Sequence, residues 1–161
     1  MTITLLLMVG AGCGYHLEGG GYLKDNTSRV SVAVFENKTA QARAGVVFTN
    51  ELIREIQEKT DTRVADNALR QIHGVVRAIT FSNISRTSST QVLQREVTAV
   101  MDVKLVDADG KILWSVRGFS AKESYDVQGD VADDQSSIDT AVDEIAQRSA
   151  ERLVSQMTAN F

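Results

Sequence analysis

The stretch VTAVMDVKLVDADGKILWS, residues 97–115, decides the fold class that the sequence predicts. Apolar residues occupy every second position from Val97 to Leu105, an alternation typical of a strand with one buried face. The sequence DADG, residues 107–110, has the composition of a hairpin turn. The alternation resumes at Ile112, so the stretch predicts two antiparallel strands joined by a tight turn.

Two further strands are predicted upstream of this hairpin. Residues 30–35 (VSVAVF) alternate in the same way and are followed by a polar turn. Residues 72–82 (IHGVVRAITFS) form a longer strand, in which Gly74 and Ala78 leave room for another group to pack closely. A polar connection, residues 83–92, joins this strand to the hairpin.

The apolar spacing changes to three or four residues in two segments, which predicts two amphipathic helices. In residues 44–59 the apolar face comprises Phe48, Leu52, Ile53 and Ile56, and the polar face comprises Glu51, Arg54, Glu55 and Glu58. The second helix follows an acidic loop, and its apolar positions run from Ile138 to Met157. Its predicted start carries Asp133, Asp134 and Ser136, which can cap a helix and favour its dipole.

The order of these elements predicts an α+β fold of two layers. We expect a mixed, mostly antiparallel sheet of about four strands, with two helices packed on one face. The residues that we expect to be mostly buried between the layers are Leu52, Ile56, Val103, Leu105, Trp114, Ile145 and Leu153.

The strand at residues 72–82 carries apolar side chains on both of its predicted faces. Strict alternation places Ile72, Val76 and Ala78 on one side. It places Val75, Ile79 and Phe81 on the other. An antiparallel sheet with one wet face should alternate more cleanly. Either a partner or a long loop of the same chain would therefore cover the second face.

The N-terminus has the pattern of a bacterial lipoprotein. An apolar run from Ile3 to Val9 is too short to span a bilayer and is followed by the small residues 10–12 and then by Cys13, the single cysteine. Small residues before a cysteine resemble a lipobox, although Gly10 stands where that pattern prefers leucine. We expect a signal peptide over residues 1–12, a lipid on Cys13, a flexible tether over 13–28 and one domain over 29–161.

The sequence lacks the usual signs of catalysis and of metal or nucleic-acid binding. The net charge of -4 disfavours a nucleic-acid partner. His16 and His73 have no second histidine or cysteine at ligand spacing, so no zinc site is predicted. No nucleophile elbow or phosphate loop occurs, and the aspartates after residue 125 lack calcium-loop spacing. We therefore expect a binding module rather than an enzyme, with no cofactor besides the covalent lipid.

Three motifs together resemble the LptE family of lipopolysaccharide-assembly lipoproteins. They are GCGYHLEG at residues 12–19, VSVAVFENKT at 30–39 and the hairpin at 97–115, in the family's order. The resemblance implies a lipid-anchored protein on the periplasmic side of the outer membrane. It further implies a protein that plugs the LptD β-barrel, helps it to fold and helps lipopolysaccharide to reach the cell surface. The alternative is another outer-membrane lipoprotein, such as a periplasmic activator of peptidoglycan synthesis.

If lipopolysaccharide binds directly, its anionic phosphates require local basic groups on this acidic protein. Arg86, in the polar connection, and Arg95, at the start of the following strand, are the candidates by position. The alternative for both is that they are ordinary solvated arginines at strand ends. Barrel contacts are expected from the second sheet face and from residues 85–90 and 108–110.

Overall fold

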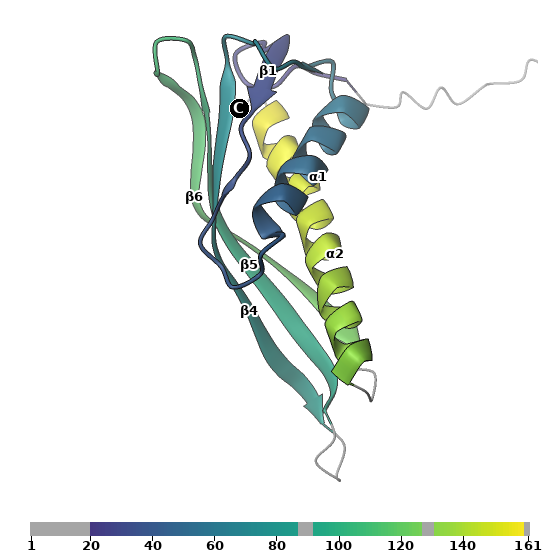
Figure 1. Cartoon of the computed structure of the whole chain (residues 1–161). Helices are drawn as coiled ribbons and strands as arrows, with labels where there is room; N and C mark the ends of the chain where they lie inside the picture. The colour runs from purple at the N-terminus through teal and green to yellow at the C-terminus, as the bar shows by residue number, and fades with distance from the viewer. Residues whose placement is uncertain (1–19, 87–91, 127–130, 160–161) are drawn as a thin grey trace, which may run out of the picture.

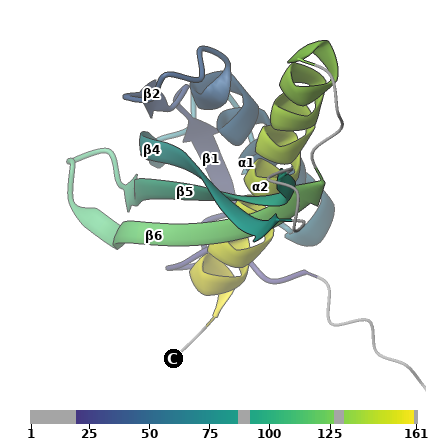
Figure 2. The same ribbon diagram turned by 90° about the horizontal axis from the view of Figure 1, so that it is seen from below.

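The computed structural model describes residues 20–86, 92–126 and 131–159, arranged as one sheet with two helices on one of its faces (Figure 1). Seen from below, the two helices lie side by side against the sheet (Figure 2). The elements are β1 (Arg29–Val32), β2 (Glu36–Asn37), α1 (Ala44–Lys59), β3 (Arg63–Val64), β4 (Gln71–Arg86), β5 (Val92–Val106), β6 (Ile112–Asp126) and α2 (Val131–Thr158). The α+β class with both helices on one face is as predicted.

The sheet is larger than predicted, with six strands in place of about four. Its order is β3-β1-β4-β5-β6, and β2 pairs with β4 beyond the end of β1. The pairs β1–β3, β1–β4 and β2–β4 are parallel, whereas β4, β5 and β6 form an antiparallel meander. Because β2 and β3 are two residues each, they are too short to produce a periodic signal in the sequence.

The predicted hairpin and helices occur with small shifts in their ends. Helix α1 spans the predicted residues, but β4 and β5 extend into the predicted polar connection as far as Arg86 and Val92. Ladder hydrogen bonds come from the backbone, so polar side chains do not end a strand. Helix α2 begins at Val131, which places Ser136 too far inside the helix to act as its cap.

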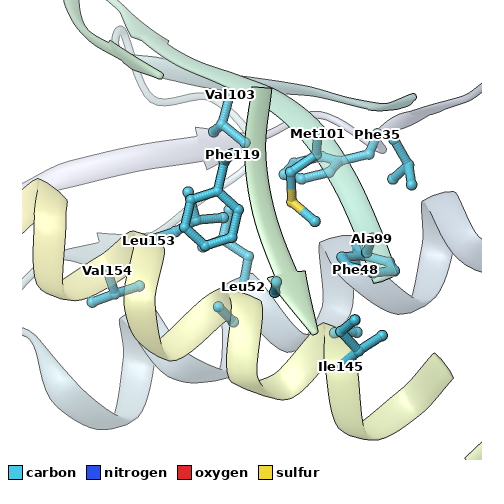
Figure 3. Packing of buried hydrophobic residues seen from close by; sticks show 14 of the residues in the cluster. Phe35, Phe48, Leu52, Ala99, Met101, Val103, Phe119, Ile145, Leu153 and Val154 are labelled. Carbon is cyan, nitrogen blue, oxygen red and sulfur yellow. The ribbon is translucent and has the colours of Figure 1, made fainter. Parts of the chain in front are cut away.

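The core lies between the meander and the two helices (Figure 3). Six of the seven predicted core residues are at most 2% exposed, namely Leu52, Ile56, Val103, Leu105, Ile145 and Leu153. The seventh, Trp114, packs against the core as predicted but is less completely buried than the other six. The reason is its place on β6, the edge strand, which has no strand on its outer side.

Gly74 allows another group to pack closely against its strand, as predicted. The ring of Phe35 lies against it so closely that a Cβ at this position would be 2.4 Å from three ring carbons. Thr49 of α1 fixes the same segment, because its hydroxyl accepts a hydrogen bond from the Phe35 backbone N–H at 2.9 Å. Phe35 therefore joins helix α1 to the centre of the sheet.

The assignment of Glu55 to the polar face of the first helix was wrong. Its side chain is buried, with the residue only 7% exposed. Helix α2 packs along α1, so the covered part of α1 is wider than its apolar stripe. Burial raises the pKa of the Glu55 carboxyl, the nearby charge of Glu151 raises it further, and Lys59 and Arg54 oppose the shift.

The segment predicted as a tether contributes in part to the packed domain. Leu23 is fully buried, and its backbone N–H donates to the Thr62 hydroxyl at 3.0 Å. Thr27 is buried as well and pairs with Leu23 in an isolated bridge. The predicted signal peptide and Cys13 lie outside the described residues.

Candidate functional site

The helix-free face of the sheet, called the outer face below, has an irregularity at its centre. Arg77 of β4 is an extra residue, inserted between the pairs Val76↔Met101 and Ala78↔Val100. On the other side of β5, Arg117 and Gly118 both stand opposite Asp102. The bulge in β4 therefore lies opposite Met101 and Val100, next to the position of Asp102 that the bulge in β6 faces, and Figure 1 shows the strands changing direction about halfway along.

The bulge in β4 corrects the prediction of an apolar second face. An extra residue reverses the alternation, so residues after Arg77 point to the opposite side from the one predicted. Ile79 and Phe81 pair with Ala99 and Val97 and pack against the core. The outer face is accordingly more polar than strict alternation implied.

Asp102 holds both bulges in place. Its Oδ1 accepts a hydrogen bond from the Gly118 backbone N–H at 2.7 Å, and its Oδ2 accepts one from Arg77 Nη1 at 2.8 Å. Gly118 has φ +63°, a left-handed conformation that favours glycine. The Gly118 hydrogen bond, followed by the Arg77 interaction, holds the pKa of the Asp102 carboxyl below its usual range.

A pocket of about 210 Å³ lies beside Asp102 on the outer face. Its lining combines apolar side chains with basic groups: His73, Val75, Asp102, Val103, Lys104, Ile112, Ser115, Val116 and Arg117. Ile112 is 53% exposed, which is unusual for a large apolar side chain on a strand. The pocket therefore offers apolar contact next to positive charge.

The cations of this pocket differ from those elsewhere on the outer face. Arg77 is paired with Asp102, and Lys122 is paired with Glu96 at 2.8 Å. Neither Lys104 nor Arg117 forms an ion pair with any residue that the structure describes. These two side chains remain able to bind an anion, such as a phosphate or carboxylate group of a ligand.

No catalytic arrangement is present in this site. The one carboxylate in the pocket, Asp102, is already bound by two hydrogen-bond donors. Among the described residues, no group of three histidine, cysteine or acidic side chains could hold a metal ion. What the pocket offers is binding of an amphiphilic anion.

The predicted site residues lie elsewhere or outside the described part of the chain. Arg95 pairs with Asn83 across the β4–β5 ladder, and its Nε donates to the Asn83 Oδ1 at 3.2 Å. The Arg86 backbone pairs with Val92 at the same end of the ladder, which brings the two arginines to one hairpin. Nine residue steps along β5 separate Arg95 from Lys104, about 30 Å along an extended strand.

Sequence reasoning missed Lys104, Arg117 and Asp102 as a group. The one available signal was Gly118, since a glycine inside an alternating strand often marks a bulge. The hydrogen bonds of the Asp102 side chain to residues of both bulges depend on the register of three strands, which the sequence does not display.

Residues 27–157 match the model of the family LptE, described as "Lipopolysaccharide-assembly". No curated protein is similar enough in sequence to count as a relative of this chain. Neither helix of the described part is both long enough and apolar enough to cross a bilayer.

Several solved structures share the fold at low sequence identity. The uncharacterized lipoprotein B of Nitrosomonas europaea matches with a TM-score of 0.60 and 15% identity, covering 99% of this chain and 92% of that one. The rare lipoprotein B of Shewanella oneidensis has a TM-score of 0.52 and 12% identity, covering 80% and 92%. PelC of Paraburkholderia phytofirmans, a dodecamer, has a TM-score of 0.51 and 16% identity, covering 87% and 95%.

Proposed function

The chain belongs to the LptE family of lipopolysaccharide-assembly lipoproteins, and we propose that it plugs and helps to assemble an LptD-like barrel of the outer membrane. The family match over residues 27–157 carries this proposal, because it includes every described strand and all but the last residue of α2. The protein has no catalytic role in this scheme. It acts by occupying the barrel and by contacting lipopolysaccharide.

Cys13 holds the protein on the periplasmic face of the outer membrane. A signal peptidase removes residues 1–12, and the exposed cysteine then carries the acyl chains. Each buried CH₂ group contributes about 0.8 kcal/mol, so two or three chains give stable anchoring. The anchor confines the domain to the membrane that contains the barrel, which raises its effective concentration there.

The outer face suits a barrel lumen because it is mixed in character. Barrel interiors are polar, and a plug needs a surface that can remain hydrated before assembly. Between its charged positions this face presents Thr80, Thr98 and Ser120, together with the partly apolar pocket near Ile112. A mixed surface of this kind is typical of interfaces that form after folding.

Lipopolysaccharide combines acyl chains with anionic phosphates, which is the chemistry that the pocket near Asp102 would recognise. Lys104 and Arg117 supply positive charge outside any ion pair there, and Val75 and Ile112 supply apolar contact. Arg86 and Arg95 at the opposite end of the ladder remain a second proposed contact. The contribution of each site to lipopolysaccharide binding can be tested separately, because the two sites lie far apart on the sheet.

Depletion of the protein in its native cell tests the function directly. We expect the folded barrel to decrease and lipopolysaccharide to disappear from the cell surface, both measurable on isolated outer membranes. Complementation with Lys104→Glu/Arg117→Glu or with Arg86→Glu/Arg95→Glu then shows which site contributes. Normal barrel and surface lipopolysaccharide on depletion, with a defect in peptidoglycan, would contradict the proposal and favour the alternative lipoprotein function.

A further inference from the structure

One end of the molecule carries arginines that lack counter-charges. Strands β1 and β3 pair in parallel with Arg29 directly beside Arg63, so two exposed guanidinium groups lie on the same face of neighbouring strands. No described carboxylate is within ion-pair distance of either one. Adjacent like charges are unfavourable unless an anion lies between them.

A groove of about 510 Å³ begins at Arg29 of this pair. It is lined by Asn26, Ser28, Arg29, Leu69 and Arg70. Leu69 is 78% exposed, the highest exposure among the large apolar side chains of the described residues. The acidic residues nearby in the sequence, Asp25, Asp61 and Asp66, do not line it.

The groove has a fixed shape because Arg70 holds one wall. Its Nη1 donates to the Asp25 carbonyl at 2.8 Å and to the Thr27 hydroxyl at 2.6 Å. Asp25 and Asn26 have φ values of 56° and 51°, so the turn between Leu23 and Thr27 is tight. Arg29, Arg63 and the tip of Leu69 thus project from a rigid platform.

The position of the proposed anchor relates this groove to the membrane. Seven residue steps separate Cys13 from Gly20, a maximum reach of about 25 Å. Gly21 lies beside β3, since its carbonyl accepts a hydrogen bond from the Asp61 backbone N–H at 3.2 Å. Figure 1 shows β1 at the same end of the molecule as the last turns of both helices, and the β4–β5 hairpin at the opposite end.

We propose that the groove around Arg29, Leu69 and Arg70, together with Arg63, docks on the anionic bilayer surface to which Cys13 is attached. The arginines contact lipid phosphates, and Leu69 enters the boundary between headgroups and acyl chains. A basic cluster with an exposed apolar side chain is the usual composition of a peripheral membrane contact. The inference rests on the proposed anchoring at Cys13, and it fixes which end of the domain faces the membrane.

The test uses tryptophan quenching by brominated lipids. Leu69→Trp is compared with Val46→Trp, which places the probe at a 52%-exposed position in the first turn of α1, away from the groove. Each protein is purified from native membranes and reconstituted into vesicles of brominated phosphatidylcholine and anionic phosphatidylglycerol. The unsubstituted protein, with Trp114 alone, gives the background signal.

We expect fluorescence to be lost at position 69 and retained at position 46. Arg29→Glu/Arg63→Glu in the Leu69→Trp protein should restore the fluorescence, whereas Arg29→Lys/Arg63→Lys should leave it quenched. High salt should also restore the fluorescence at position 69, and so should vesicles without phosphatidylglycerol. Three results would overturn the proposal. They are equal quenching of the two tryptophans, no quenching at position 69, and quenching at position 69 that is unchanged in the Arg29→Glu/Arg63→Glu protein.

The state of Cys13 is measured separately by mass spectrometry. If the thiol is not acylated, the proposed anchoring is wrong, and the same thiol is coupled to a maleimide lipid before the quenching measurement. The membrane contact is then tested with the chain attached at the same residue, so failure of the anchor and failure of the groove give different results.

Discussion

Asp102 shows how one side chain can stabilise two strands. Its carboxylate accepts the Gly118 N–H, which the bulge in β6 removes from the regular ladder, and it also fixes Arg77 in the opposite bulge. Without this carboxylate, the Gly118 N–H would lose a hydrogen bond that contributes about 1 kcal/mol to stability. The residue has a structural role, and the unpaired cations beside it remain available for binding.

Replacing this carboxylate should therefore lower stability in a pH-dependent way. The pKa of Asp102 is lowered in the folded state, so its contribution is present above the ordinary titration range of an aspartate. It is lost as the pH falls through the folded pKa. We expect Asp102→Ala to cost about 1–2 kcal/mol at neutral pH, and the difference from the parent to shrink in acid.

Urea unfolding at several pH values measures this contribution. The matched control is Asp109→Ala, in the exposed turn between β5 and β6, which should change stability little at any pH. An Asp102→Ala protein as stable as its parent at neutral pH would show that the bulges hold without the carboxylate.

Glu55 is the opposite case, a carboxylate that costs stability. Burial and the charge of Glu151 raise its pKa in the folded state, so ionisation at neutral pH disfavours folding. The cost is fully present above the raised folded pKa, decreases as the pH falls through it and vanishes below the ordinary pKa of a glutamate. Glu55→Gln should accordingly increase the free energy of unfolding at neutral pH, with a difference that vanishes in acid below that ordinary pKa.

Chemical denaturation across this pH range tests the sign of the effect. Glu144→Gln, on the exposed side of α2, is the matched control and should leave stability nearly unchanged. A loss of stability in Glu55→Gln at neutral pH would indicate that the carboxylate makes a favourable interaction in the folded protein.

At the scale of the elements, the core lies where both helices pack against each other and against the sheet. Leu52 and Ile145 are fully buried and belong to one continuous core (Figure 3). Truncating such a side chain removes its transfer free energy and leaves a cavity. Leu52→Ala and Ile145→Ala should each cost about 2–5 kcal/mol.

Val46→Ala on the same helix as Leu52 is the control, because Val46 is 52% exposed. Its effect on the free energy of unfolding should be within about 0.5 kcal/mol. The midpoint of urea unfolding, at unchanged slope, reports the difference. Equal midpoints for Leu52→Ala and Val46→Ala would contradict the observed helix face.

At the scale of the whole molecule, the two ends of the sheet have different tasks. The end with β1 and β3 lies near Gly20 and thus within reach of the anchor, whereas the β4–β5 hairpin lies at the far end (Figure 1). The two ends therefore present different surfaces, a basic end within reach of the proposed anchor and the ends of β4 and β5 far from it.

The anchor itself is tested by Cys13→Ala. We expect this variant to leave the outer-membrane fraction, or to retain residues 1–12, because signal peptidase cleavage and acylation both require the cysteine. Fractionation with mass spectrometry of the N-terminus distinguishes the two results. An outer-membrane protein with an unmodified Cys13 would contradict the lipoprotein assignment.

The sequence by itself determined the features that depend on local periodicity. The α+β class, the bounds of α1, the hairpin around residue 110 and six of seven core residues follow from apolar spacing over short windows. The family resemblance was carried by contiguous motifs, and the match over residues 27–157 confirms it. These features require no knowledge of which strands become neighbours.

Only the tertiary structure decided the features that depend on register. One extra residue, Arg77, moves Ile79 and Phe81 into the core, and the short parallel strands β2 and β3 exist because β4 and β1 lie beside them. Arg117 and Gly118 stand opposite Asp102, and Arg29 stands beside Arg63, through pairing between separate strands. Strand pairing is set by packing across the whole sheet, so residues distant in sequence form the pocket and the groove without any local signal.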